Sequence, residues 1–357
     1  MSRPISNPHI ADVCAAIAIP DRSYADRTQA ALDAKTKPRR SLGRLEDLAC
    51  QYAAIVGASA PALPKKSVVV MGADHGVAAN GVSAYPREVT AQMLLNFARG
   101  GAAINVLSRH AGASVIVVDM GVCEPVIDPA IESVRIGPGT ADFTRQAAMT
   151  EAQCEAALAA GIAIAERLAA DGCNVVGLGD MGIGNTTASS ALTAALTGAQ
   201  VEEVTGFGTG ISDEARRNKM ATIRRALELH QPDRSHPLQV LQQLGGFEIA
   251  GLTGVVLGAA SRRMAVVLDG FIASVAALLA VRIAPNAKHY LLPSHRSVEA
   301  GHRIVLRELG QIPLFDFDMR LGEGTGAALA MTVLDASLKI LHEMATFETA
   351  GVSDSGK

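Results

Sequence analysis

The sequence changes from a strand-like to a helical pattern within Leu314-Phe-Asp-Phe-Asp-Met-Arg-Leu-Gly-Glu-Gly-Thr-Gly-Ala-Ala-Leu-Ala-Met331. Residues 314–317 form a short, mostly apolar run, whereas apolar residues recur at three-to-four spacing from Gly326 to Met344. We therefore predict that Glu323 lies in a glycine-rich turn at the carboxyl end of a strand. Open α/β sheets bind ligands at this end of their strands, so Glu323 is a candidate functional residue.

Short runs rich in Val and Ile alternate with longer amphipathic runs from Lys65 onward. This alternation is typical of βαβ units and of a parallel sheet covered on both faces. We predict an α/β fold with a Rossmann-like parallel sheet of about six strands flanked by helices. The predicted strands are Ser67–Met71, Val115–Met120, Asn174–Gly177, Ala265–Leu268, His289–Leu292 and Leu314–Phe317. The predicted helices between them are Glu88–His110, Glu151–Ala170, Thr187–Leu196, Asp213–Leu229, Glu248–Ser261, Phe271–Arg282 and Val298–Leu309.

The chain is expected to form one large domain and a smaller, mainly helical lobe. Residues 1–64 are predicted to be an N-terminal helical segment in the small lobe, and residues 65–330 the large α/β domain with the active site. Residues 331–357 are predicted to be a C-terminal helix and a loose tail. A chain of 357 residues, 49% of them hydrophobic, is long enough to bury a large core.

The net charge of −3 and the lack of any Lys/Arg run argue against nucleic acid or an anionic membrane as partner, so small molecules are expected. The five cysteines are scattered and form no Cys-x-x-Cys pair, which favours a reducing cytoplasm. The N-terminus shows no signal-peptide pattern. The apolar run from Met264 to Ala284 contains Asp269, Arg282 and a turn signal, which favours a buried strand and helix over a membrane span.

A second glycine-rich stretch, Gly177-Leu-Gly-Asp-Met-Gly-Ile-Gly-Asn-Thr-Thr187, follows the third predicted strand and leads into a helix. Its small residues let backbone N–H groups at the helix start approach a phosphate closely, and a monophosphate is the simplest ligand. The spacing Gly177-x-Gly179-x-x-Gly182, with Glu202 and Glu203 about twenty residues further on, also leaves open a dinucleotide fingerprint and an NAD-dependent oxidoreductase.

Other stretches carry polar side chains suited to ligand binding. Tyr85 and Gln92 can line a pocket for a flat ring, although a Tyr-Pro pair also commonly opens a helix. Lys219 follows the small-residue loop Gly206-Phe-Gly-Thr-Gly210 and can supply a cation for a phosphate, whereas most helix lysines are solvated. Asp74-His75 alone is too small a set to indicate a metal site. We predict neither a metal nor a cofactor.

Taken together, these stretches resemble the nicotinate-nucleotide–dimethylbenzimidazole phosphoribosyltransferases, the family that makes the lower-ligand nucleotide of cobalamin. The resemblance extends from about residue 35 to residue 330. The matching residues are Lys37-Pro38, Ser41-Leu-Gly-Arg-Leu-Glu46, Asp74-His-Gly76, Tyr85-Pro86, Val89-Thr90, Gln92-Met93, Met181-Gly-Ile-Gly-Asn-Thr-Thr187, Gly208-Thr-Gly210, Asp269-Gly-Phe-Ile272, Ser294-His295 and Arg320-Leu-Gly-Glu-Gly-Thr-Gly326.

The resemblance implies transfer of the 5-phosphoribosyl group from nicotinate mononucleotide to 5,6-dimethylbenzimidazole, which gives α-ribazole 5′-phosphate and nicotinate with inversion at the anomeric carbon. It implies a homodimer, with Glu323 as general base and Asp180 as a candidate second catalytic carboxylate. The implied phosphate- and nucleotide-binding residues are Gly182, Ile183, Gly184, Asn185, Thr186, Thr187, Gly208, Thr209, Gly210 and Lys219. The implied base-binding residues are Tyr85, Gln92, Met181 and Leu321.

The chemistry of the implied reaction requires only one base. A pyridinium ring leaves as a neutral molecule, whereas the attacking azole becomes cationic and must lose its N–H proton. Apolar neighbours such as Met181 and Leu321 are expected to raise the pKa of Glu323. Two residues depart from the family pattern, because Asp180 replaces the usual Glu and Phe207 stands where Arg is frequent. A different acceptor and a non-catalytic paralogue therefore remain alternatives.

Overall fold

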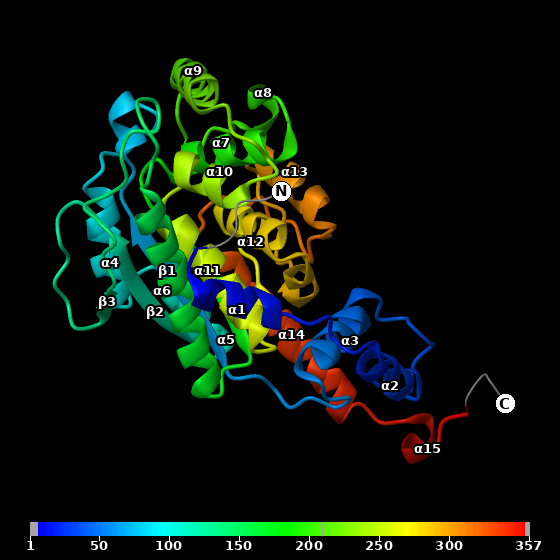
Figure 1. Cartoon of the computed structure of the whole chain (residues 1–357). Helices are drawn as coiled ribbons and strands as arrows, with labels where there is room; N and C mark the ends of the chain where they lie inside the picture. Colours follow the sequence, from blue (N-terminus) through cyan, green and yellow to red (C-terminus); the bar gives the residue numbers. More distant parts are fainter. Residues whose placement is uncertain (1–5, 209, 354–357) are drawn as a thin grey trace.

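The centre of the structure is a six-stranded parallel sheet with the strand order β3-β2-β1-β4-β5-β6. Three of its strands, β1, β2 and β3, are labelled in Figure 1. The computed structural model describes residues 6–208 and 210–353. The strand order runs outward in both directions from β1 and β4, so the topological switch point lies between these two strands. This sheet confirms the predicted α/β fold. The strands are β1 (Lys66–Ala73), β2 (Ala113–Gly121), β3 (Ile131–Ser133), β4 (Val175–Met181), β5 (Ala265–Val267) and β6 (Leu291–Leu292).

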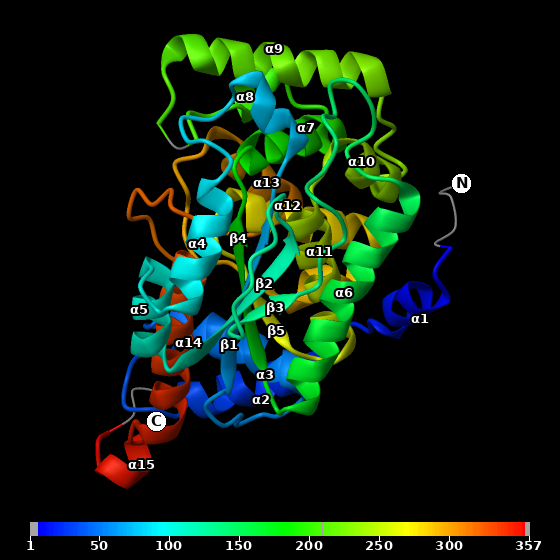
Figure 2. The ribbon, with the colours of Figure 1, turned by 90° about the vertical axis from the view of Figure 1, so that its left-hand side faces the viewer.

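Helices cover both faces of the sheet (Figure 2). α6 (Glu151–Ala170) and α11 (Phe247–Ser261) cover one face, whereas α4 (Val89–Ala98), α5 (Ala103–Ala111) and α14 (Thr325–Glu343) cover the other. Every residue of β1 is buried, as expected for a central strand between two helical layers. α6 and α11 cross closely because both carry glycines there; a Cβ on Gly161 would lie 1.8 Å from the carbonyl oxygen of Gly251.

The chain ends contribute helices at the edge of this core. α2 (Arg22–Asp33) and α3 (Arg44–Val56) pack on each other and on α14, whereas α1 (Pro8–Ala16) packs against α6 and α11. The division of the chain at residues 64 and 330 stays a prediction, and residues 354–357 of the predicted loose tail lie outside the described residues. The remaining helices are η1 (Gly76–Asn80), α7 (Asn185–Thr197), α8 (Val201–Val204), α9 (Asp213–His230), α10 (Pro237–Leu244), α12 (Phe271–Ile283), η2 (Pro285–Tyr290), α13 (Ala300–Leu309) and α15 (Phe347–Ala350).

One predicted strand is wrong. Leu314–Phe317 makes only an isolated parallel bridge, between His295 and Phe315, and is not a strand of the sheet. Asp318, with a φ of 52°, ends the extended segment shortly after this bridge. The sixth strand is instead the short β3, which has too few residues for a clear alternating pattern.

Two predictions of helices also differ from the structure. The predicted helix Glu88–His110 is two helices, α4 and α5, because Gly100, with a φ of 78°, and Gly101 interrupt it. The helix α10, whose first residue is Pro237, is not among the predicted helices. Among the residues that the structure describes, none of the helices is both long enough and apolar enough to span a membrane.

Candidate active site

The turn between β4 and α7, residues 182–184, lies at the switch point of the sheet. Gly184 has a φ of 100°, which glycine adopts without steric cost, and α7 begins at the next residue. The hydroxyl of Thr90 accepts a hydrogen bond from the Ile183 N–H at 3.2 Å, which helps to hold the turn. Within the described part of the chain, the N–H groups of Gly184 and Thr186 have no acceptor and are available to an anion.

A small cavity of about 30 Å³ lies beside this turn. Lys219 of α9 reaches it from below the surface; the residue is 1% exposed, and its Nζ donates a hydrogen bond to the hydroxyl of Thr186 at 2.7 Å. Burial lowers the pKa of Lys219 to about 8, although the Glu299 carboxylate acts in the opposite direction. Lys219 is therefore a buried cation and not a solvated helix lysine. The cavity is lined by Val82, Ser83, Gly182, Ile183, Gly184, Asn185, Thr186, Phe207, Gly208, Ile211 and Lys219.

Glu323 lies in the turn before α14 and has a φ of 63°, an unusual conformation for a residue with a side chain. The turn packs on β4 because Gly179 has no side chain; a Cβ there would lie 2.5 Å from the Glu323 carbonyl oxygen. Glu323 is 6% exposed, and its Oε2 has no hydrogen-bond partner among the described residues. Burial raises the pKa of the Glu323 carboxyl, and the Ile104 backbone N–H acts in the opposite direction. A carboxylate with a raised pKa accepts a proton more readily than an ordinary glutamate.

Asp269, which follows β5, holds the Glu323 turn in place. Its Oδ2 accepts a hydrogen bond from the Gly324 N–H at 3.0 Å, and its Oδ1 accepts one from the Gly326 N–H at 2.6 Å. Burial raises the pKa of Asp269 to about 7, even though these backbone donors favour the carboxylate. The sequence pattern indicates only a turn at Asp269, because its partner Gly324 lies 55 positions away.

Comparisons with known proteins show the family of the chain. A curated relative from Roseiflexus sp. (strain RS-1), named nicotinate-nucleotide–dimethylbenzimidazole phosphoribosyltransferase, is 55% identical over 334 residues, which are 93% of this chain and 95% of the relative. The chain belongs to this family. A family model described as "Phosphoribosyltransferase" matches residues 17–352. A relative of the same name from Geobacter sp. (strain M21) is 51% identical over 93% of this chain and 96% of its own.

Solved structures of the phosphoribosyltransferase family share the fold. The crystal structure of CobT from Thermus thermophilus is similar, with a TM-score of 0.89 and 46% identity, over 93% of this chain and 100% of that one. A second structure from the same organism, described as the nicotinate-nucleotide–dimethylbenzimidazole phosphoribosyltransferase, has a TM-score of 0.88 and 46% identity over 94% of this chain and 100% of that one. The chain is therefore a pentosyltransferase.

In this phosphoribosyltransferase, Asp180 lies near the end of β4, two residues before the turn at residues 182–184. Its Oδ2 accepts a hydrogen bond from the Asn185 side chain at 2.9 Å, whereas its Oδ1 has no partner among the described residues. Burial raises the pKa of Asp180 well above its usual range, and the Asp269, Glu248 and Glu323 carboxylates raise it further. Asp180 and Glu323 thus belong to one buried acidic cluster.

The glycines that suggested a dinucleotide fingerprint have another structural cause. Gly177 and Gly179 lie within β4, and only Gly182 lies in the turn after the strand. A Cβ on Gly177 would lie 3.0 Å from the Met331 side chain of α14. The lack of a side chain at Gly177 therefore lets α14 pack closely on the sheet. Glu202 lies on the exposed surface of α8. In the described part of this phosphoribosyltransferase, no feature supports the oxidoreductase alternative.

The predicted base-binding residues lie mostly at the surface of the single chain. Tyr85 is 52% exposed and Leu321 is 57% exposed, and Gln92 is also exposed. Met181 is half-buried at the end of β4. More than half of Leu321 is therefore exposed in the single chain, and the raised pKa of Glu323 is due to burial.

The predicted nucleotide-binding residues are divided between the cavity and its surroundings. Gly208 lines the cavity, Gly210 is exposed, and Thr209 lies outside the described residues. Thr187 is fully buried and does not line the cavity. Phe207 is 47% exposed, and the Arg216 guanidinium lies over its ring at 5.2 Å from the centroid. Arg216 thus supplies a positive charge at this loop, a contribution that the sequence pattern did not indicate.

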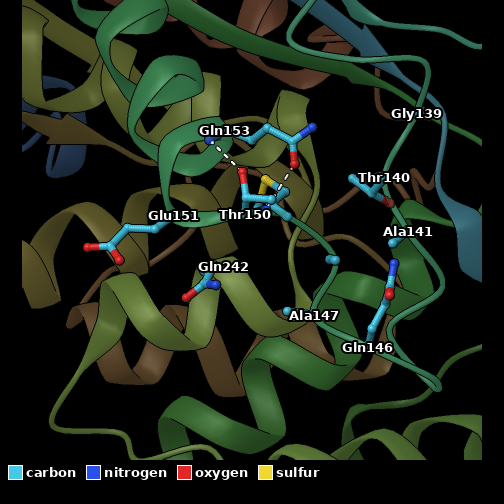
Figure 3. Close-up of a pocket in the computed structure, with 11 residues that line it drawn as sticks. Gly139, Thr140, Ala141, Gln146, Ala147, Thr150, Glu151, Gln153 and Gln242 are labelled. Carbon is cyan, nitrogen blue, oxygen red and sulfur yellow. Dashed lines mark hydrogen bonds between the residues drawn. The ribbon is translucent and has the colours of Figure 1, made fainter.

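A larger pocket of about 640 Å³ lies between the segment 139–153 and α10 (Figure 3). The Thr150 hydroxyl at the start of α6 accepts a hydrogen bond from the Gln153 N–H at 3.1 Å, so this polar group already caps the helix. None of the predicted site residues that the structure describes lines this pocket. Its lining is Gly139, Thr140, Ala141, Gln146, Ala147, Ala148, Met149, Thr150, Glu151, Gln153 and Gln242.

Proposed function

We propose that this phosphoribosyltransferase transfers the 5-phosphoribosyl group from nicotinate mononucleotide to 5,6-dimethylbenzimidazole, with Glu323 as the general base. The observation that carries the proposal is the buried Glu323 carboxyl with its raised pKa, at the same edge of the sheet as the phosphate turn and Lys219. The names of the relatives support the identity of the two substrates.

The bond changes require one proton acceptor. An azole nitrogen of the base attacks the anomeric carbon from the face opposite nicotinate, and the bond from that carbon to the pyridinium nitrogen breaks. Its electron pair stays on the nicotinate ring, which leaves without needing a proton. The new ribosyl-benzimidazole carries a positive charge until its other nitrogen gives its proton to Glu323. The products are α-ribazole 5′-phosphate and nicotinate.

The phosphate of the nucleotide is proposed to bind at the turn between β4 and α7. The unpaired N–H groups of Gly184 and Thr186 and the ammonium of Lys219 are suited to a dianion. Gly182, Ile183, Asn185 and Gly208 complete this side of the cavity. The ribose would then extend toward Asp180 and Glu323, and the base toward Met181 and Leu321.

A chromatographic assay of the purified protein with nicotinate mononucleotide and 5,6-dimethylbenzimidazole tests the function. Release of nicotinate together with a new ribotide is the expected result. If the nucleotide binds but neither product forms, the protein uses another acceptor or has lost catalysis. An assay with NAD and reduced substrates separates the transferase from an oxidoreductase. The transferase is expected to show no absorbance change at the nicotinamide band.

The value of kcat/KM for nicotinate mononucleotide is expected to be bell-shaped in pH. On the acid side it should fall as Glu323 becomes protonated, at a pH above the usual range of a glutamate, because burial raises its pKa. On the basic side it should fall above about pH 8, where free Lys219 loses its proton. A rate profile across both limbs measures the two effects. A profile that stays flat on the basic side would contradict the role of the ammonium.

We also propose that the enzyme is a homodimer whose base site is completed by the second copy. Tyr85, Leu321 and Phe317 are large apolar side chains, between 52% and 65% exposed, in the segments around the proposed site. A binding site for a flat apolar base must be enclosed by apolar side chains. A second copy would cover these exposed side chains and so enclose the site. Analytical ultracentrifugation is expected to give twice the mass of one chain. A monomer that retains full activity would refute the proposal.

A further inference from the structure

His75 and Glu248 form a buried pair that the proposed reaction does not use. The His75 Nε2 and the Glu248 Oε1 are 2.6 Å apart, and both side chains are 0% exposed. Among the described residues, the His75 Nδ1 and the Glu248 Oε2 have no hydrogen-bond partner. Burying a polar pair that leaves two polar atoms unpaired is costly, so this pair does not simply add to the stability of the core.

The pair lies directly against the turn between β4 and α7. A Cβ on Gly182 would lie 3.3 Å from the Glu248 Oε1 and 3.3 Å from the His75 Cδ2. A Cβ on Gly184 would lie 3.3 Å from the His75 Cβ. Both glycines also line the small cavity. The turn therefore lies between the cavity and the pair.

The pair also joins two elements that are distant in the sequence. His75 follows the central strand β1, and Glu248 lies in the first turn of α11. The hydrogen bond between them thus fixes the start of α11 relative to the end of β1, with the turn after β4 against both. Backbone N–H groups bind an anion well only when their positions are preorganised.

We propose that His75 and Glu248 are positioning residues that set the geometry of the turn at residues 182–184 and thereby the affinity for the nucleotide's phosphate. This inference rests on the proposed function, because it requires the turn to bind phosphate. Neither residue touches the reacting atoms, so the expected effect is on phosphate affinity and not on the chemical step.

Gly246 offers a way to disturb the pair without removing its polar groups. A Cβ at this position would lie 2.3 Å from the His75 Cε1 and 2.6 Å from the Glu248 Oε2. The backbone of Gly246, with φ −145° and ψ 159°, is extended and tolerates a side chain. Gly246→Ala therefore displaces the pair itself. Gly258→Ala, within α11, is the matched control, because its Cβ would lie 2.9 Å from the Ala165 Cβ of α6 and contacts neither member of the pair.

The test measures dissociation constants of inorganic phosphate, nicotinate mononucleotide and 5,6-dimethylbenzimidazole by calorimetry. Gly246→Ala and Glu248→Gln are expected to raise the first two constants about tenfold, equivalent to about 1.4 kcal/mol, and to leave the third nearly unchanged. Only Gly246→Ala, which keeps every carboxylate near Asp180, is also expected to leave kcat at saturation nearly unchanged. Gly258→Ala is expected to lower the melting temperature but to keep wild-type phosphate affinity. If Glu248→Gln does not fold, the phosphate affinity of Gly246→Ala tests the inference.

Two results would overturn the inference, and they are distinguishable. If the folded variants bind phosphate as tightly as the wild-type protein, the pair only holds the fold together, while the proposed function stands. If the wild-type protein itself binds neither phosphate nor the nucleotide, the phosphate turn is wrongly assigned, and the proposed function fails together with the inference.

Discussion

Glu323→Gln is expected to lower kcat by about 10²-fold or more while leaving the affinity for nicotinate mononucleotide nearly unchanged. Glutamine keeps the shape of the side chain but cannot accept the proton that the azole must lose. The local fold should survive, because the turn is held by Asp269 through the backbone N–H groups of Gly324 and Gly326 and not by the Glu323 side chain. Single-turnover measurements with saturating nucleotide isolate the chemical step.

The control for this variant is Glu343→Gln, at the exposed end of the same helix, α14, which should behave as the wild-type protein. The acid limb of the pH profile should also disappear in Glu323→Gln, because the group that titrates there is gone. An unchanged kcat would show that Glu323 is not the base. Asp180, another carboxyl of the cluster, would then be the next residue to test.

Lys219→Met is expected to raise KM for nicotinate mononucleotide by about 10²-fold, because charge-assisted hydrogen bonds to phosphate contribute about 2–3 kcal/mol. Methionine has a similar length but carries no charge and cannot donate to Thr186. Stability is expected to fall modestly, because the variant also loses the hydrogen bond to Thr186 and the attraction to the buried Glu299. Steady-state kinetics together with thermal melting separate the two effects.

Arg217→Met serves as the control, because Arg217 lies on the same helix, α9, but is exposed. Its KM should remain within about twofold of the wild-type value, as for most exposed charges. The inhibition by inorganic phosphate should weaken in Lys219→Met in parallel with KM. If KM is unchanged in Lys219→Met, the phosphate binds elsewhere, and Arg216 beside Phe207 becomes the candidate cation.

Local patterns predicted much of the fold and part of the site. The alternation of Val-rich runs and amphipathic runs identified the central strands β1, β2 and β4, because buried strands of parallel sheets are continuously apolar. The pattern failed for Leu314–Phe317. Its apolar side chains suit a strand, but its backbone forms only one isolated bridge, with His295. It missed β3, since three residues carry too little periodicity to detect.

The sequence alone was sufficient to locate the two glycine-rich turns, with Glu323 in one and Gly184 in the other, because backbone conformation at a turn depends on adjacent residues. Only the tertiary structure revealed that Lys219 is buried, that Asp269 holds the Glu323 turn, and that His75 pairs with Glu248. Burial, hydrogen bonding and the resulting pKa shifts depend on groups that lie far apart in the chain. His75 and Glu248 are 173 positions apart, and no local pattern connects them.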